Sequence, residues 1–146
     1  MVNEEVKTII HIGQHKTGTT SFQHHLQAEK QRYSQGGLYI PESIAGCDNP
    51  SHYMLNVYAL NADRYSSMKE SLERDMSSSF WDQLEGRLRQ DVARHYAQAK
   101  REGCQDVIWS NEGLYLLNSV EEYSRLCTLF RPYSSSINCC ISIRST

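Results

Sequence analysis

Short apolar runs alternate with longer amphipathic segments along this chain. The first run, Thr8-Ile9-Ile10-His11-Ile12, is rich in β-branched residues and stops at Gly13, and helical spacing of apolar residues begins after Gly18. Comparable runs predict strands over 38–40, 106–110 and 137–143, in addition to the first over 8–12. Strands separated by helices are typical of an α/β fold with a parallel sheet.

The clearest helical pattern begins at Trp81 and ends before Gly103. Apolar residues repeat there at four-residue spacing, opposite a charged face: Leu84, Leu88, Val92 and Tyr96. Two further helices are predicted over 53–60 and 120–130. In the second of these we expect four residues to face the core: Tyr123, Leu126, Cys127 and Phe130. The polar stretch 66–79 predicts a surface helix or a mobile segment.

Composition and charge narrow the function classes. The 146 residues are 39% hydrophobic and 22% charged, which predicts one globular domain over 1–146. Fifteen basic and 17 acidic residues leave a net charge of -2, which favours neither nucleic acid nor an anionic membrane surface as a partner. The chain has no long apolar run, and its first residues lack the features of a signal peptide, so we expect a cytoplasmic protein.

Cysteine and histidine usage predicts neither a disulfide framework nor a metal site. The five cysteines are an odd number and contain no C-x-x-C spacing, and the six histidines form no ligand pattern. We therefore expect buried thiols in a reducing compartment.

The segment between the first strand and the first helix carries the candidate chemistry: Gly13-Gln14-His15-Lys16-Thr17-Gly18-Thr19-Thr20-Ser21. Backbone N–H groups at a helix N-terminus bind anions. The spacing of Gly13 and Gly18 matches a Walker A loop, but Thr19 stands where that loop has its lysine, and the lysine lies inside the loop as Lys16. The alternative is a turn that only caps the helix.

The stretch from His11 to Gln23 resembles the 5'-phosphosulfate-binding loop of sulfotransferases that use 3'-phosphoadenosine 5'-phosphosulfate (PAPS), in the form seen in bacterial sulfotransferase-like proteins. A looser likeness continues through 37–41, His52, 110–114 and Arg144. The resemblance implies a P-loop-type sheet whose first strand lies between the third and the fourth, and a reaction without metal. It implies these donor-binding residues: Gly13, His15, Lys16, Thr17, Gly18, Thr19, Thr20, Ser21 and Arg144.

The same resemblance suggests roles for individual residues. Lys16 would stabilise the negative charge that grows on the leaving phosphate, and Arg144 would bind the 3'-phosphate. Glu112, directly after the third strand, would take the proton from the acceptor, unless it only caps the following turn. His15 and His52 are rival bases, although a surface or structural role is favoured for each.

The resemblance covers nearly all of this chain but only about the N-terminal half of a typical sulfotransferase domain. We therefore expect a domain truncated after the fourth strand, or one that a partner completes. The uncovered strand 137–143 would leave a sheet edge open to self-association.

Three functional interpretations stay open. The first is transfer of a sulfuryl group from PAPS to a hydroxyl or amine of a small molecule or glycan, with acceptor contacts from 42–80. The second is a P-loop nucleotide kinase or NTPase, which Thr19 and the lack of a Walker-type carboxylate disfavour. The third is a non-catalytic module that holds an adenosine phosphate or associates with another protein.

Overall fold

A parallel sheet forms the centre of the computed structural model, which describes residues 5–13, 19–46 and 52–142. Its four strands lie in the order β2-β3-β1-β4. Their bounds are Lys7–Gly13 for β1, Leu38–Tyr39 for β2, Asp106–Ser110 for β3 and Ile137–Ser142 for β4. Every pairing is parallel. The predicted α/β fold is confirmed, as is the position of the first strand between the third and the fourth.

The helices lie close to where the apolar spacing predicts them. Their bounds are Thr19–Ala28 for α1, Lys30–Gln35 for α2, Met54–Ala59 for α3, Ser67–Asp75 for α4, Ser78–Arg101 for α5 and Val120–Thr128 for α6, with a 3-10 turn η1 over Glu112–Leu116. The polar stretch before α5 is therefore a helix, and α5 begins before Trp81 because Phe80 is also buried.

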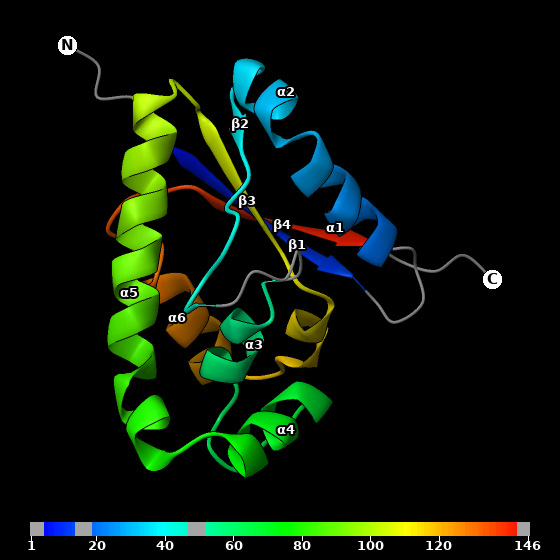
Figure 1. Ribbon diagram of the computed structural model, residues 1–146, viewed down its shortest axis with the longest axis vertical. Coiled ribbons are helices and arrows are strands. Elements are labelled where there is room, and N and C mark those ends of the chain that lie inside the picture. The colour runs from blue at the N-terminus through cyan, green and yellow to red at the C-terminus, as the bar shows by residue number, and fades with distance from the viewer. Residues whose placement is uncertain (1–4, 14–18, 47–51, 143–146) are drawn as a thin grey trace.

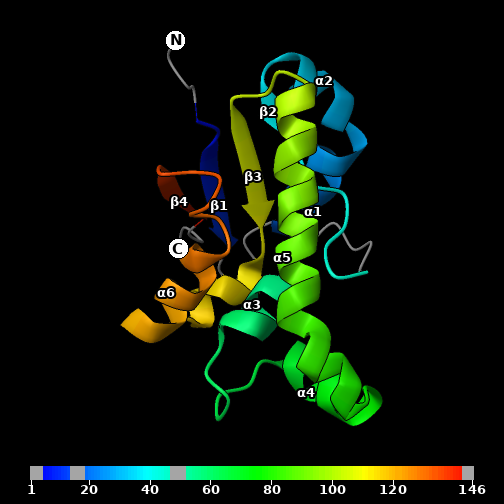
Figure 2. The same ribbon diagram turned by 90° about the vertical axis from the view of Figure 1, so that its left-hand side faces the viewer.

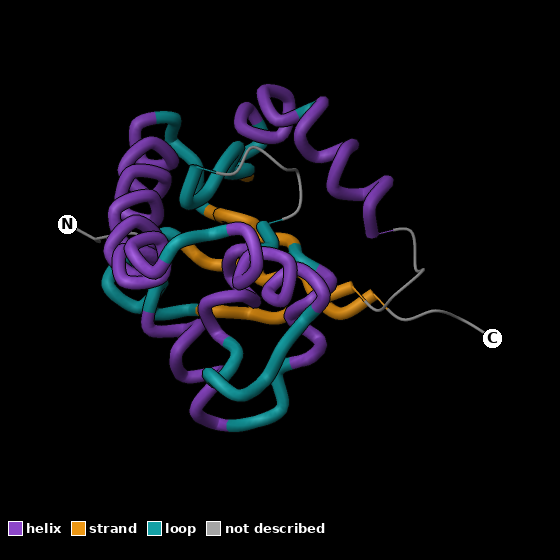
Figure 3. Tube along the Cα trace, turned by 60° about the horizontal axis from the view of Figure 1, so that its bottom comes forward, coloured by secondary structure: helices purple, strands orange, loops and turns teal. Residues whose placement is uncertain are grey.

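Helices cover both faces of the sheet (Figures 1 and 3). Successive strand residues point to opposite faces, so Ile10 of β1 joins the large core with α3, α5 and α6, whereas Ile9 packs with α1 and α2. The large core contains the most deeply buried side chains, among them Ile10, Leu55, Leu88, Trp109 and Phe130. The smaller cluster consists of Leu26, Ile40 and Ile108.

The long helix α5 is fixed to two strands through Tyr96. Its hydroxyl lies 2.5 Å from the Thr8 hydroxyl of β1 and accepts a hydrogen bond from Trp109 Nε1 of β3 at 3.2 Å. Burial raises the pKa of Tyr96 to about 12, so the hydroxyl keeps its proton. Helices α3, α4 and α6 gather beyond the end toward which β3 points (Figure 2).

Two expectations about individual side chains are wrong. In α6, Tyr123 is exposed and Cys127 is half-buried, while Glu122 is fully buried. The helix is rotated because the Glu122 carboxylate has polar partners in the interior. Cys139 and Cys140 are exposed thiols rather than buried ones, because β4 is an edge strand, whereas Cys104 is buried as expected. Cys47 lies outside the described residues.

No helix within the described parts of the chain is long and apolar enough to cross a membrane.

Candidate functional site

The carboxyl ends of the parallel strands meet at one edge of the sheet, which is where open α/β sheets bind ligands. Register pairs His11 with Ser110 and Gly13 with Ser142, so β1, β3 and β4 end side by side. Three candidate segments therefore leave this edge: the one after Gly13, the one after Ser110 and the one after Ser142. Five predicted site residues lie outside the described residues, namely His15, Lys16, Thr17, Gly18 and Arg144.

Helix α1 begins at Thr19, on the far side of the candidate loop from Gly13. Its first turn contains no acidic residue, so its partial positive charge is not neutralised there. Ser21 is exposed and Gly13 is buried at the end of β1. The start of α1 is thus compatible with an anion.

A buried polar network that the sequence did not reveal lies between α1 and the ends of β1 and β3. Gln23 Nε2 of α1 donates to Ser110 Oγ of β3 at 3.0 Å, and this hydroxyl lies 2.8 Å from His11 Nδ1 of β1. The Phe22 ring packs on the imidazole with 4.6 Å between centroids. Burial lowers the pKa of His11, which keeps the ring neutral. The network ties both elements that flank the loop to the neighbouring strand.

One signal could have indicated this network. His11 and Ile9 share the face of β1 that α1 and α2 cover, and a polar residue on such a face requires a hydrogen-bonding partner. The partner itself lies 99 positions away in sequence, and only the register of β1 on β3 identifies it.

His52 serves the structure and is not available as a base. The Ser110 backbone N–H donates to His52 Nδ1 at 3.0 Å, so the ring proton sits on Nε2, which donates to the Pro41 carbonyl at 2.9 Å. The His52 backbone N–H also donates to the Ser110 carbonyl at 2.9 Å. Burial lowers the pKa of this imidazole to about 4. Both ring nitrogens are occupied, which confirms the structural interpretation of this histidine.

The backbone of Glu112 lies where the sequence predicts it, just past β3, as the first residue of η1. The turn is tightly packed, since a Cβ atom on the next residue, Gly113, would lie 2.8 Å from Asn56 Cγ. The predicted closeness of Glu112 to Lys16 and Arg144 involves residues outside the described ranges.

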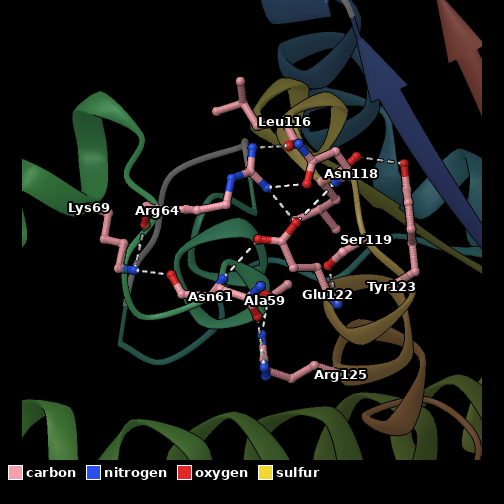
Figure 4. A network of polar contacts seen from close by, with 11 residues as sticks. Ala59, Asn61, Arg64, Lys69, Leu116, Asn118, Ser119, Glu122, Tyr123 and Arg125 are labelled. Carbon is pink, nitrogen blue, oxygen red and sulfur yellow. Dashed lines mark hydrogen bonds and ion pairs between the residues drawn. The ribbon is translucent and has the colours of Figure 1, made fainter.

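A second polar network lies beside η1 and centres on Glu122 (Figure 4). Its carboxylate accepts hydrogen bonds from the Asn61 backbone N–H at 2.9 Å, from the Asn118 backbone N–H at 3.0 Å and from the Arg64 guanidinium. Burial alone would raise the pKa of Glu122, but these backbone donors and the guanidinium outweigh it and hold the pKa below its ordinary value. Arg64 also donates to the Leu116 carbonyl at the end of η1. The network therefore joins the segment before α4 to the segment after β3.

Two further cations complete this network. Lys69 Nζ donates to the carbonyls of Asn61 and Arg64 at 2.9 Å and 2.7 Å, and Arg125 donates to the Ala59 carbonyl at 2.6 Å. Their donors are engaged by backbone carbonyls, so the cluster rigidifies the segment between α3 and α4. We assign it a structural role.

Over the described ranges, no group of three or more His, Cys, Asp or Glu side chains could hold a metal ion. No known family model matches the chain, and neither a curated protein nor a solved structure matches it. Interpretation of the site therefore depends on its own geometry and on the motif that precedes α1.

Proposed function

We propose that this chain binds PAPS and transfers its sulfuryl group to a hydroxyl or amine acceptor, acting as the donor-binding part of a sulfotransferase. One observation carries the proposal: the parallel order β2-β3-β1-β4 puts the ends of β1, β3 and β4, from which three segments start, at the same edge of the sheet. These are the three segments that contain Lys16, Glu112 and Arg144. The four cysteines among the described residues are free thiols, two of them exposed on β4, and free thiols are typical of the reducing, cytoplasmic setting that we propose for it.

The hydrogen-bond donors and cations that the sequence places at this edge suit an anionic nucleotide. Helix α1 has hydroxyl residues and no carboxylate in its first turn, and the motif before it contains a lysine. Lys16 and the segment 17–21 would hold the 5'-phosphosulfate, and Arg144 would hold the 3'-phosphate. PAPS supplies an activated sulfuryl group when it is bound.

Different residues of this chain would stabilise the leaving group and remove the proton of the acceptor during transfer. Lys16 would stabilise negative charge on the phosphate oxygen as its bond to sulfur breaks, an interaction that is stronger in the transition state than in the ground state. Glu112 would accept the proton of the acceptor hydroxyl or amine while the acceptor oxygen or nitrogen forms its bond to sulfur. His52 takes no part, because both of its ring nitrogens are engaged.

Calorimetric titration with 3'-phosphoadenosine 5'-phosphate (PAP) and with magnesium-ATP tests the donor class. We expect PAP to bind more tightly, and Arg144→Ala to weaken its binding by roughly 1.5–3 kcal/mol. Lys100→Ala is the matched control, because this exposed lysine lies at the end of α5, away from the carboxyl edge. Preference for magnesium-ATP would favour the kinase or NTPase interpretation, and binding of neither ligand would favour the protein-interaction module.

Transfer from sulfur-labelled PAPS to a panel of sugars and amines tests the chemistry. We expect Lys16→Ala to lower the rate by about 10²–10³-fold. Glu112→Gln should lower it by about 10²–10⁴-fold with PAP affinity unchanged, because it removes the base and keeps the shape. Unchanged transfer and unchanged PAP affinity in Lys16→Ala would refute the assignment of the loop.

A further inference from the structure

Asn56 is a polar residue in the middle of an otherwise apolar buried helix. The other buried residues of α3 are Met54, Leu55, Val57 and Ala59. A buried amide lowers stability unless its hydrogen bonds are satisfied, and here both ends of the amide are used. Asn56 Nδ2 donates to Asn111 Oδ1 at 2.6 Å, and Asn56 Oδ1 accepts from Ser66 Oγ at 3.2 Å.

The Asn56 amide contacts the residues on both sides of Glu112. Asn111, which it hydrogen-bonds, precedes Glu112, and Gly113, which it packs against, follows it. A Cβ atom on Gly113 would lie 2.8 Å from Asn56 Cγ and 3.1 Å from Asn111 Oδ1, so the absence of a side chain there permits the contact.

Strand β1 holds the start of the segment 111–114, directly after β3. The Asn111 backbone N–H donates to the His11 carbonyl at 3.1 Å, and the Leu114 N–H donates to the Asn111 carbonyl at 3.4 Å. The backbone that carries Glu112 thus lies between β1 and α3. Of these two supports, Asn56 is the one made by a side chain, so it can be removed by substitution.

We propose that Asn56 is the positioning residue for Glu112. This inference rests on the proposed function, in which Glu112 is the base. A general base works only within hydrogen-bond reach of the proton it removes, and a displacement of about 1 Å can lower a rate by about 10²-fold. Asn56 also connects Glu112 to the start of α4, because Ser66 is the N-cap of that helix and accepts from the Lys69 N–H at 3.1 Å. The region expected to contact the acceptor is therefore coupled to the base.

Amide hydrogen exchange tests the positioning without any need for turnover. In Asn56→Ala we expect the Asn111 and Leu114 amides to exchange at least about 10-fold faster relative to the β3 amides of Val107 and Trp109. Val57→Ala is the matched control, a core truncation in the same helix at a residue whose apolar side chain donates no hydrogen bond to Asn111. Equal changes in the two variants, or no change at the Asn111 and Leu114 amides, would overturn the inference. Asn56→Leu, which keeps the number and branching of the side-chain heavy atoms, replaces Asn56→Ala if the latter does not fold.

Transfer kinetics then test the link to the base. We expect Asn56→Ala to lower kcat by about 10²-fold and to leave KM for PAPS unchanged. In a Glu112→Gln background the same substitution should cause no further loss, because a residue that acts only through Glu112 has nothing left to position.

The outcomes separate the inference from the proposed function. Independent, multiplicative losses in the double variant, or a lower kcat in Glu112→Gln with normal kcat in Asn56→Ala, refute the positioning role alone. Normal kcat in Glu112→Gln refutes Glu112 as the base and with it this part of the proposed function.

Discussion

Strands β3 and β4 both pair in parallel with β1, one on each side, and they are buried to very different extents. In β3, Val107, Ile108, Trp109 and Ser110 are all buried. In β4, Cys139, Cys140 and Ile141 are exposed, and Ile141 keeps 62% of its surface accessible. The difference arises because β3 lies between β1 and β2 and has helices on both faces, whereas β4 is at the edge of the sheet.

This contrast shows that strand pairing and side-chain burial contribute separately to the stability of a strand. Strand β3 is stabilised by apolar packing, with Trp109 surrounded by Tyr96, His52 and Phe130. Strand β4 depends mainly on its backbone ladder to β1, and Ile137 at its start packs against the large core. Two strands with similarly apolar sequences therefore contribute differently to the stability of the fold.

Truncating one isoleucine in each strand should give the largest difference. Ile108 is 8% exposed and Ile141 is 62% exposed. We expect Ile108→Ala to lower the free energy of unfolding by about 2–5 kcal/mol, because it leaves a cavity, and Ile141→Ala to change it by less than about 0.5 kcal/mol. Urea denaturation of both variants measures the two values, and equal losses would show that β4 is covered in solution.

Acid should destabilise the protein by protonating His52, whose ring joins Ser110 of β3 to the Pro41 carbonyl. The unfolded imidazole binds a proton near pH 6.5, whereas burial lowers the pKa of the folded one to about 4. Stability is therefore fully present above pH 6.5 and falls as the pH drops toward 4, by up to about 3 kcal/mol. Unfolding of the wild type and of His52→Gln at pH 7 and pH 4.5 measures this contribution. The glutamine retains a donor for the Pro41 carbonyl, and a fall of equal size in the variant would exclude His52 as a cause.

Removing the charge of Glu122 should weaken the helix that leads into β4. Glu122→Gln replaces charge-assisted hydrogen bonds at a buried carboxylate, and we expect a loss of about 1–3 kcal/mol in the free energy of unfolding. Glu121→Gln is the control, because Glu121 is an exposed carboxylate in the same turn. Thermal and urea unfolding compare the two, and matching losses would contradict a special role for Glu122.

Thiol labelling should report the contrast with almost no effect on stability. We expect a maleimide to modify Cys139 and Cys140 in the native protein and Cys104 at least about 100-fold more slowly, because Cys104 is buried. Peptide mass spectrometry identifies the sites. Protection of Cys139 and Cys140 that grows with protein concentration would support self-association through β4.

Much of the architecture is readable from local patterns in the chain. Short apolar runs predict the four strands that the structure describes, and the four-residue spacing predicts α5, because both signals depend on the geometry of a single element. The motif between β1 and α1 predicts a ligand site at the carboxyl edge of the sheet. The proposed roles of Lys16, Glu112 and Arg144 also come from the sequence and stay predictions.

Only the tertiary structure decided which polar residues are buried and which thiols are exposed. No local pattern marks Glu122 as buried, and its carboxylate accepts from the backbone N–H of Asn61, 61 positions away, and from the Arg64 guanidinium. Asn56 is likewise paired with a residue 55 positions away, and Gly113 matters only because that amide lies against it. Such pairings depend on how the helices rotate and pack on the sheet. The free energy of this packing comes from many contacts between residues that are distant in sequence, so no local stretch of sequence reveals them.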